Sequence, residues 1–223
     1  MQPDFSIENE YSQLIVSGID EAGRGPLAGP VVASCAILDQ NDFSGKNSNL
    51  ILSKINDSKK LSKIQRGKIF IELKKTIKFG VGIVDEKIID EINILQATKL
   101  AMLRAFLDLQ NKYQLFPHVI LIDGNFVPFE KDSLKEKNDI QQMEAIIKGD
   151  QKSLSIAAAS IIAKETRDEI MKDLHVQYPN YGFDRHAGYP TKFHIENIKE
   201  FGICEFHRKS FEPIKSLLKL SCK

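Results

Sequence analysis

Two adjacent acidic residues, Asp20 and Glu21, stand directly before a glycine-rich segment over residues 23–29. An apolar run over 14–19 leads into the two acids, which predicts that they lie at the end of a buried strand. Carboxylates at such a place usually bind a divalent cation, and glycine lets a phosphate-bearing ligand approach the backbone closely. The pattern therefore indicates chemistry on a phosphate.

The same glycines also resemble a fingerprint for dinucleotide binding, with Gly23, Gly25 and Ala28 in its three positions. That fingerprint requires a helix directly after the glycines, because the helix N-terminus holds the pyrophosphate. Here Pro26 and Pro30 bracket the segment, and a strand-like run follows it. Two acids would also repel a pyrophosphate that carries no metal, so we favour a cation site.

Two further acids follow apolar runs in the same way. Asp123 comes directly after the run over 119–122, and Asp150 comes shortly after the run over 145–147. Each acid taken alone would most often be a turn residue or a helix cap. Three places with one pattern instead favour a common site, because ligands of α/β sheets collect at strand ends.

The four strand-end acids are Asp20, Glu21, Asp123 and Asp150. They cannot all stay ionised side by side, since two unit charges about 4 Å apart repel by roughly 4 kcal/mol at an effective dielectric constant near 20. Divalent cations would relieve this repulsion, and ligands that are all oxygen favour Mg²⁺ or Mn²⁺ over zinc. Because such ions are typical of phosphoryl transfer, the acids predict a metal-dependent nuclease.

The elements that must position these acids alternate along the chain. Strands are expected near 13–19, 29–38, 78–84, 118–122 and 142–148. Helices are expected over 62–75, over 91–111 with Asp90 as its N-cap, over 153–175 and over 210–220. The glycine-rich turn should pair the first two strands antiparallel, and the small residues at 157–163 favour close packing of their helix.

The chain has 223 residues, of which 42% are hydrophobic, so it can bury a full core. We expect a catalytic core over 1–175 and a helical C-terminal appendage of the same domain over 176–223. No apolar run reaches the roughly 18 residues of a membrane span. The first residues lack the features of a secretion signal, and the three cysteines lack metal-ligand spacing. We therefore expect a cytoplasmic protein with reduced thiols.

The net charge of +1 conceals local excesses of basic residues. Residues 44–79 contain ten Lys or Arg and two acids, and residues 185–223 contain eight and four. Such segments can follow a phosphate backbone, or they can be solvated surfaces. Both interpretations stay open, also for the sequence His-Arg-Lys at 207–209.

The chain resembles the bacterial type of the ribonuclease HII family in eight ordered motifs that cover nearly its whole length. The motifs lie at 18–30, 56–61, 90–95, 121–125, 147–150, 155–161, 188–191 and 207–211. A single motif would be weak evidence, but eight in order are specific. The related ribonuclease HIII group is disfavoured, because this chain has Gly-Arg-Gly rather than Gly-Thr-Gly at 23–25.

The resemblance implies an α/β protein with the ribonuclease H-like fold: a five-stranded mixed sheet flanked by helices, with a helical C-terminal subdomain. It implies an endoribonuclease that hydrolyses the RNA strand of RNA–DNA hybrids and nicks on the 5′ side of single ribonucleotides embedded in duplex DNA. Its partners would be such duplexes. No protein partner can be identified from the sequence, and a monomer is expected.

The family's catalytic carboxylates correspond to Asp20, Glu21, Asp123 and Asp150. They imply two ions, Mg²⁺ or Mn²⁺, in the reacting complex. One ion would activate water and the other would stabilise the departing 3′ oxygen, which leaves 3′-hydroxyl and 5′-phosphate ends.

Substrate contacts are implied for six residues: Gly23, Arg24, Gly25, Lys59, Lys60 and Tyr189. The three residues of the Gly-Arg-Gly sequence would contact the 2′-hydroxyl, which distinguishes RNA from DNA at a site, and the following phosphate. Tyr189 would stack on the next sugar. The two lysines are either phosphate contacts or a solvated pair.

Some features differ from the family pattern and leave the groove contacts open. Segment 39–55 and the stretch between Asp123 and Asp150 are long, Ala187 stands where Lys is frequent, and Glu165 stands where a small apolar residue is common. Two other functions stay open. A junction resolvase or integrase-like nuclease of this fold would cut without regard to a ribose, and a nucleic-acid-binding module would bind without cutting.

Overall fold

The computed structural model describes residues 2–11, 13–39, 52–55, 61–130 and 139–221. At its centre lies one sheet of five strands in the order β3-β2-β1-β4-β5. The strands are β1 (Val16–Ala22), β2 (Val31–Ile37), β3 (Lys78–Val84), β4 (Val119–Asp123) and β5 (Gln142–Ile146). Strand β1 pairs antiparallel with β2 and parallel with β4. The predicted mixed sheet and the antiparallel first pair are thereby confirmed.

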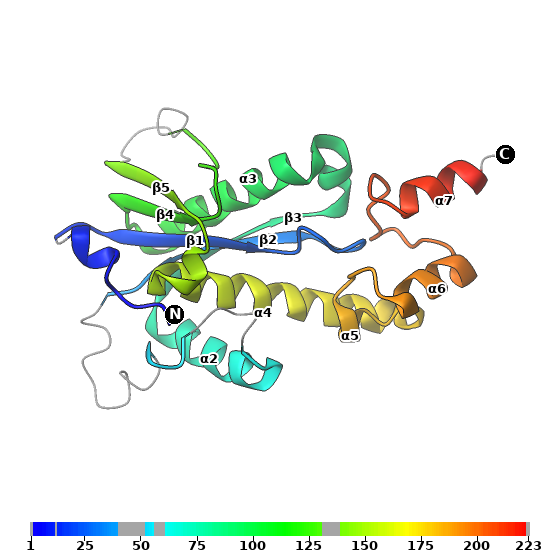
Figure 1. The fold of residues 1–223 in the computed structure, drawn as a ribbon, viewed down its shortest axis with the longest axis horizontal. Helices are drawn as coiled ribbons and strands as arrows, with labels where there is room; N and C mark the ends of the chain where they lie inside the picture. The colour runs from blue at the N-terminus through cyan, green and yellow to red at the C-terminus, as the bar shows by residue number, and fades with distance from the viewer. Residues whose placement is uncertain (1, 12, 40–51, 56–60, 131–138, 222–223) are drawn as a thin grey trace.

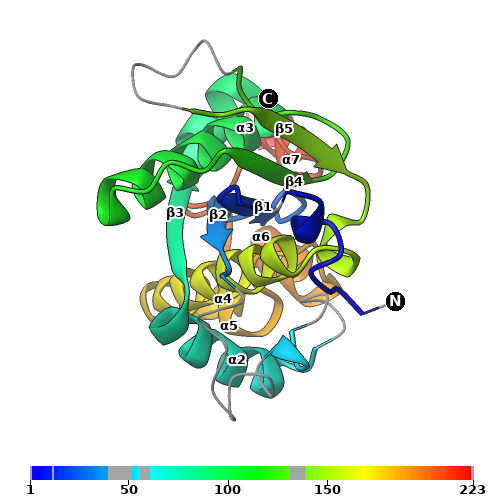
Figure 2. The same ribbon diagram turned by 90° about the vertical axis from the view of Figure 1, so that its left-hand side faces the viewer.

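Helices cover both faces of this sheet (Figures 1 and 2). One face carries α3 (Glu86–Tyr113), and the other carries α4 (Leu154–Gln177) with α2 (Lys63–Thr76) outside it. The shorter helices are η1 (Glu8–Tyr11), η4 (Gly149–Gln151), η5 (Pro179–Tyr181), α5 (Phe183–His186), α6 (Lys192–Phe201) and α7 (Ile214–Ser221). Figure 1 shows α5, α6 and α7 beyond one end of the sheet. None of the helices in the described part of the chain is long and apolar enough to cross a membrane.

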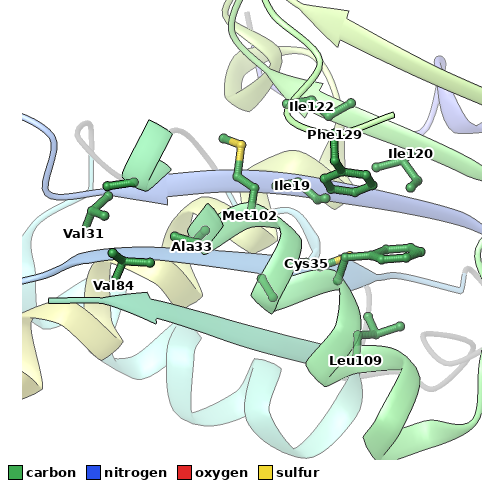
Figure 3. Packing of buried hydrophobic residues seen from close by; sticks show 14 of the residues in the cluster. Ile19, Val31, Ala33, Cys35, Val84, Met102, Leu109, Ile120, Ile122 and Phe129 are labelled. Atoms are coloured by element: carbon green, nitrogen blue, oxygen red, sulfur yellow. The ribbon is translucent and has the colours of Figure 1, made fainter. Parts of the chain in front are cut away.

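The core beneath α3 is built from side chains that alternate along the strands and meet one face of the helix. Figure 3 shows this packing, in which Ile19 of β1 and Val31 of β2 lie among Met102 of α3 and other apolar residues. The rings of Phe106 and Phe129 meet at 5.5 Å between centroids. Because β1 and β4 beneath this core pair in parallel, the C-terminal ends of both strands lie on the same side of the sheet.

On the opposite face, α4 packs with its backbone directly against β1. A Cβ atom on Gly18 would lie 2.2 Å from the carbonyl carbon of Ser155, so only glycine allows this approach. The neighbouring residues of α4, Ala157, Ala158 and Ala159, are all fully buried. The close packing predicted from the small residues of 157–163 is therefore confirmed.

Helix α3 is broken at Asn93, whose backbone is not helical (φ 67, ψ 164) and whose side chain accepts hydrogen bonds from the N–H groups of Leu95 and Gln96. Its first part begins five residues earlier than predicted, and the prediction of Asp90 as the N-cap was wrong. The cap is Asp85, whose carboxylate accepts a hydrogen bond of 2.9 Å from the N–H of Ile88. The prediction counted the apolar face from Ile92, whereas Ile89 already belongs to the buried face. Asp90 instead accepts hydrogen bonds from the C-terminal segment.

The last helix was predicted over 210–220, but α7 spans Ile214–Ser221. Its start is displaced because Ser210 is held outside the helix by Asp90, which accepts from both the N–H and the hydroxyl of Ser210. Pro213 directly precedes the first helical residue. The contact ties the C-terminal segment to the first turn of α3.

Candidate active site

The ends of β1 and β4 bring three of the predicted acids together at one edge of the sheet. Asp20 and Glu21 lie inside the last three residues of β1, so their predicted place at the end of a strand is confirmed, although the strand continues to Ala22 rather than ending near residue 19. Asp123 is the last residue of β4. In the parallel pairing Ile19 faces Ile122, so Asp20 and Asp123 follow on neighbouring strands in the same register.

Asp20 is the most deeply buried of these three acids, with 5% of its surface exposed. Burial raises the pKa of Asp20 well above its usual value, and the charges of Glu21 and Asp123 raise it further. Hydrogen bonds from the Ser160 side chain and from the N–H of Glu21, which is 2.7 Å from Oδ1, act in the opposite direction. An added positive charge at this edge would therefore favour the ionised carboxylate.

The chain beside Asp150 is connected to Asp123 through the residue before it. The N–H of Gly149 donates a hydrogen bond of 2.7 Å to Oδ1 of Asp123, and the next residue, Asp150, is 4% exposed. Lys148 has φ 56 and ends the predicted strand early, so the chain turns here into η4. Asp20, Glu21 and Asp123 thus interact through their charges, and the backbone next to Asp150 is hydrogen-bonded to Asp123.

The donor set of this edge fits a hard divalent cation. Every candidate ligand is a carboxylate oxygen, as Mg²⁺ and Mn²⁺ prefer. Within the residues that the structure describes, no three or more His, Cys, Asp or Glu side chains are already arranged to hold a metal ion. The residue types and the raised pKa of Asp20 fit the predicted cation. The side chains themselves do not form a complete set of metal ligands within the described residues.

The Gly-Arg-Gly segment lies beside the acids. Gly23 has φ +98, a conformation that favours glycine, and it follows directly on β1. The guanidinium of Arg24 lies 3.2 Å from Oε1 of Glu21. A Cβ atom on Gly25 would lie 3.5 Å from the ring of Tyr189, which is 43% exposed. The structure therefore brings Tyr189 next to the segment with which the resemblance associates it.

The remaining predicted contacts, Lys59 and Lys60, lie outside the described residues. In the helix that follows them, Arg66 is buried and donates to Glu165 at 2.5 Å and to Asp168 at 3.1 Å. Within the basic segment 44–79, this arginine thus ties α2 to α4 rather than facing a phosphate. Glu165, which departs from the family pattern, is the partner that makes the pair possible.

Both interpretations of 207–209 were wrong for the first two residues. His207 and Arg208 are 1% and 0% exposed, so neither is a surface contact nor a solvated side chain. The hydrogen bond from Ser160 to Asp20 was not predicted, although a hydroxyl within the run of small apolar residues 157–163 could have indicated it. Arg208 has no such signal, because its partners are main-chain carbonyls far away in the sequence.

Comparison with known proteins decides the family. A family model described as Ribonuclease HII matches residues 17–214. The chain belongs to the ribonuclease HII family. Ribonuclease HII of Chlamydia trachomatis serovar A is 50% identical over 212 residues, which cover 94% of this chain and 87% of that protein. Membership in this family makes the chain a ribonuclease H, a hydrolase, and not a binding module.

Solved structures confirm the ribonuclease H-like fold. Ribonuclease H2 from Pyrococcus horikoshii OT3 superposes with a TM-score of 0.73 at 29% identity, covering 93% of this chain and 99% of that one. Bst ribonuclease HIII, solved in complex with Mn²⁺, has a TM-score of 0.71 at 21% identity, covering 99% of this chain and 74% of that one. The second likeness concerns the fold alone.

Proposed function

We propose that this member of the ribonuclease HII family hydrolyses the RNA strand of RNA–DNA hybrids and nicks duplex DNA on the 5′ side of single embedded ribonucleotides. The proposed catalytic residues are Asp20, Glu21, Asp123 and Asp150. The observation that supports the proposal is that Asp20, Glu21 and Asp123, the Gly-Arg-Gly segment and Tyr189 lie close together near the ends of β1 and β4. A single place on the molecule thus offers cation ligands and a backbone that a nucleotide can approach.

The four carboxylates would hold the divalent cations, two of them in the reacting complex, with Asp20 and Asp123 as central ligands. When bound, Mg²⁺ or Mn²⁺ would lower the pKa of the attacking water and stabilise negative charge on the departing 3′ oxygen. Cleavage would leave 3′-hydroxyl and 5′-phosphate ends. The all-oxygen donor set and the raised pKa of Asp20 support this proposal. The Mn²⁺ complex of a protein of the same fold agrees with it.

The residues of this chain would select and orient the nucleotide. Backbone N–H groups of the Gly-Arg-Gly segment would donate to the 2′-hydroxyl oxygen, because glycine leaves the main chain bare. Arg24 is exposed enough for its guanidinium to meet the next phosphate with charge-assisted hydrogen bonds. The exposed ring of Tyr189 would cover the following sugar, and Lys59 and Lys60 would contact phosphates outside the site.

The organisation proposed for the chain is a catalytic core over 1–175 with a C-terminal appendage over 176–223 that belongs to the same domain. Apolar residues of both parts, such as Leu27, Met171 and Phe183, share one buried cluster, which supports a single domain. We further propose that the enzyme acts as a cytoplasmic monomer on RNA–DNA hybrids and ribonucleotide-containing DNA.

The proposal is tested by cleavage of a DNA duplex that carries one ribonucleotide, with Mg²⁺, with Mn²⁺ and with a chelator. The control is the same duplex made of DNA alone. We expect a nick on the 5′ side of the ribonucleotide that depends on the added cation, and an intact control. Cleavage of the all-DNA or a branched duplex with equal efficiency would instead support the resolvase-like alternative.

A further inference from the structure

Two arginines at the site, Arg167 of α4 and Arg208 between α6 and α7, are fully buried. All the hydrogen bonds found for the two guanidinium groups within the described residues go to main-chain carbonyls. Arg167 donates to the carbonyls of Pro30 at 2.8 Å, Ala187 at 2.9 Å and Ala28 at 3.0 Å. A buried guanidinium used in this way orders backbone rather than pairing with an acid.

Arg208 holds the part of the loop that contains the Gly-Arg-Gly segment. Its Nη2 donates to the carbonyl of Gly23 at 2.6 Å, and its Nη1 donates to the carbonyl of Arg24 at 3.1 Å. Its Nε and Nη2 reach the carbonyl of Gly29 at 2.9 and 2.8 Å. The N–H of Arg208 itself donates to the carbonyl of Leu27 at 2.8 Å. One residue thus fixes four carbonyls of the loop 23–29.

Holding these carbonyls determines where the neighbouring N–H groups point. In a trans peptide the carbonyl and the following N–H point in opposite directions within one plane. Only Glu212–Pro213 is cis among the described peptide bonds. Because Arg208 takes the carbonyls of Gly23 and Arg24, the N–H groups of Arg24 and Gly25 are turned away from it. A cationic donor on each carbonyl also polarises the peptide and strengthens its N–H as a donor.

We propose that Arg208 is a positioning residue that aims the N–H groups of Arg24 and Gly25 at the ribonucleotide and thereby sets the preference for ribose over deoxyribose. This inference rests on the proposed function. It assigns to one buried side chain the orientation of both donors. The planar fork of arginine can hold several carbonyls at fixed angles, whereas the single ammonium of lysine cannot.

The cost of burying this cation agrees with a functional role. Burial, and then the nearby charge of Arg167, lowers the pKa of Arg208 to about 9, so the side chain is still charged at neutral pH. Buried charges are weak evidence for stability, because apolar residues can often replace them. Phe211 covers the guanidinium, with its ring centroid 5.0 Å away. The charge of Arg208 is therefore used to hold the carbonyls of the loop 23–29.

Arg167 offers a matched control. It is as deeply buried as Arg208 and packs against Gly23, where a Cβ atom would lie 2.1 Å from Nε of Arg167, but it donates to the carbonyls of Ala28 and Pro30 rather than to those of Gly23 and Arg24. Arg167→Lys and Arg208→Lys keep the charge and remove the fork in both cases. Loss of stability is therefore expected in both variants, whereas a changed orientation of the N–H groups of Arg24 and Gly25 is expected only in Arg208→Lys.

The experiment measures kcat and KM for a duplex with one ribonucleotide, together with the ratio of its dissociation constant to that of the all-DNA duplex. We expect Arg208→Lys to lose about tenfold in this binding preference for each misdirected N–H, since 1.4 kcal/mol is a factor of ten. Arg167→Lys should keep the wild-type preference. Thermal unfolding of both variants reports whether they are folded.

Equal preference in wild type and Arg208→Lys, while the wild type distinguishes the two duplexes, would overturn the inference alone. A wild type that does not distinguish them would overturn the proposed function instead. If Arg208→Lys does not fold, the amide ¹⁵N signals of the wild type decide. Those of Arg24 and Gly25 should shift with the ribonucleotide duplex and not with all-DNA, and identical shifts with both would contradict the proposal.

Discussion

The guanidinium of Arg24 lies 3.2 Å from Oε1 of Glu21, so a proposed substrate contact forms an ion pair with a proposed cation ligand. The arginine side chain is 46% exposed and that of the glutamate is 12% exposed. The pair gives Glu21 a countercharge while no divalent cation is bound. A cation that takes Glu21 would release Arg24, which would then be available to a phosphate.

Replacement of Arg24 by glutamine should tighten cation binding to the substrate-free enzyme. The variant removes both a competitor for Glu21 and a positive charge beside the site. Because one partner is largely exposed, the pair contributes at most about 1 kcal/mol, so the gain should be up to about fivefold. Calorimetric titration with Mn²⁺ measures it. Lys192→Gln, which removes an exposed cation elsewhere, should change nothing, and unchanged affinity in Arg24→Gln would show that the pair does not compete.

Asp123→Asn should abolish most turnover and leave duplex binding largely intact. The amide cannot supply the negative charge that a cation requires, and the stabilisation lost is several kcal/mol, or about 10²- to 10³-fold in kcat. Single-turnover cleavage and fluorescence anisotropy with the same duplex measure the two quantities. Asp108→Asn on α3, which contacts only Val81 and Lys112 in the hydrogen bonds described, is the control. Binding lost in parallel with activity would speak against a ligand role for Asp123.

The acids could be predicted from the sequence because their signal is local. Asp123 follows an apolar run directly, and an unexpected charge after a buried strand is visible in any single chain. The antiparallel pairing of β1 and β2 also followed from a local pattern, since a glycine-rich turn joins the two strands, whereas the order of the other strands was not predicted. Arg208 could not be predicted in this way. Its carbonyl partners lie about 180 positions earlier, and any residue type carries a carbonyl.

The free energy of unfolding should fall as the pH is lowered from about 6.5 to about 4, because two buried histidines that share a hydrogen bond resist protonation in the native protein. Nε2 of His194 lies 3.1 Å from Nε2 of His207, so one ring donates and the other accepts. Burial lowers the pKa of each to about 4, and the stacked ring of His186 adds to the effect on His194. Between about pH 6.5 and 4 the histidines take up protons in the unfolded chain but not in the native protein, so the free energy of unfolding decreases as the pH is lowered.

Urea denaturation at pH 7, 5.5 and 4.5 measures this slope. For two groups the limit is about 2.7 kcal/mol per pH unit. Acidic residues titrate in the same range, so the comparison is with the double variant His194→Gln/His207→Gln, which lacks both imidazoles. A shallower slope in the double variant is expected. Parallel curves for the two proteins would mean that the histidine pair does not resist protonation.

Breaking the buried ion pair between α2 and α4 should be costly. Arg66 bonds to Glu165 and Asp168, and Lys164 completes the group by bonding to Asp168 at 2.6 Å. Arg66→Met leaves Glu165 buried without its partner, so we expect a loss of about 3–5 kcal/mol in the free energy of unfolding. Urea denaturation measures it. Lys75→Met, which removes a surface pair with Glu72, should cost less than about 1 kcal/mol.

The double variant Arg66→Met/Glu165→Leu separates the pair from the burial of a lone charge. Because both charges are then absent, it should recover a large part of the stability lost in Arg66→Met. A double variant as unstable as the single one would mean that Arg66 stabilises α2 mainly through Asp168. Either result bears on how the helix after the Lys59 and Lys60 segment is held.

Two glycine-to-alanine substitutions should change the free energy of unfolding in opposite directions. In Gly18→Ala the new Cβ would lie 2.2 Å from the carbonyl carbon of Ser155 and 2.3 Å from the backbone nitrogen of Ile156, so α4 must move away from β1. We expect a loss of about 1–3 kcal/mol or more. Gly67→Ala in α2 meets nothing closer than 3.8 Å and should gain about 0.5–1 kcal/mol, because alanine favours the helix.

Thermal unfolding of the two variants compares them directly, and activity distinguishes the site from the scaffold. Gly18 stands two residues before Asp20, and α4 carries the Ser160 that donates to Asp20. A shift of α4 away from β1 therefore disturbs the acid as well as the core, so kcat should fall in Gly18→Ala at temperatures where the protein is still folded. Gly67→Ala should keep full activity. If Gly18→Ala were as stable as Gly67→Ala, the backbone of α4 would not lie directly on β1.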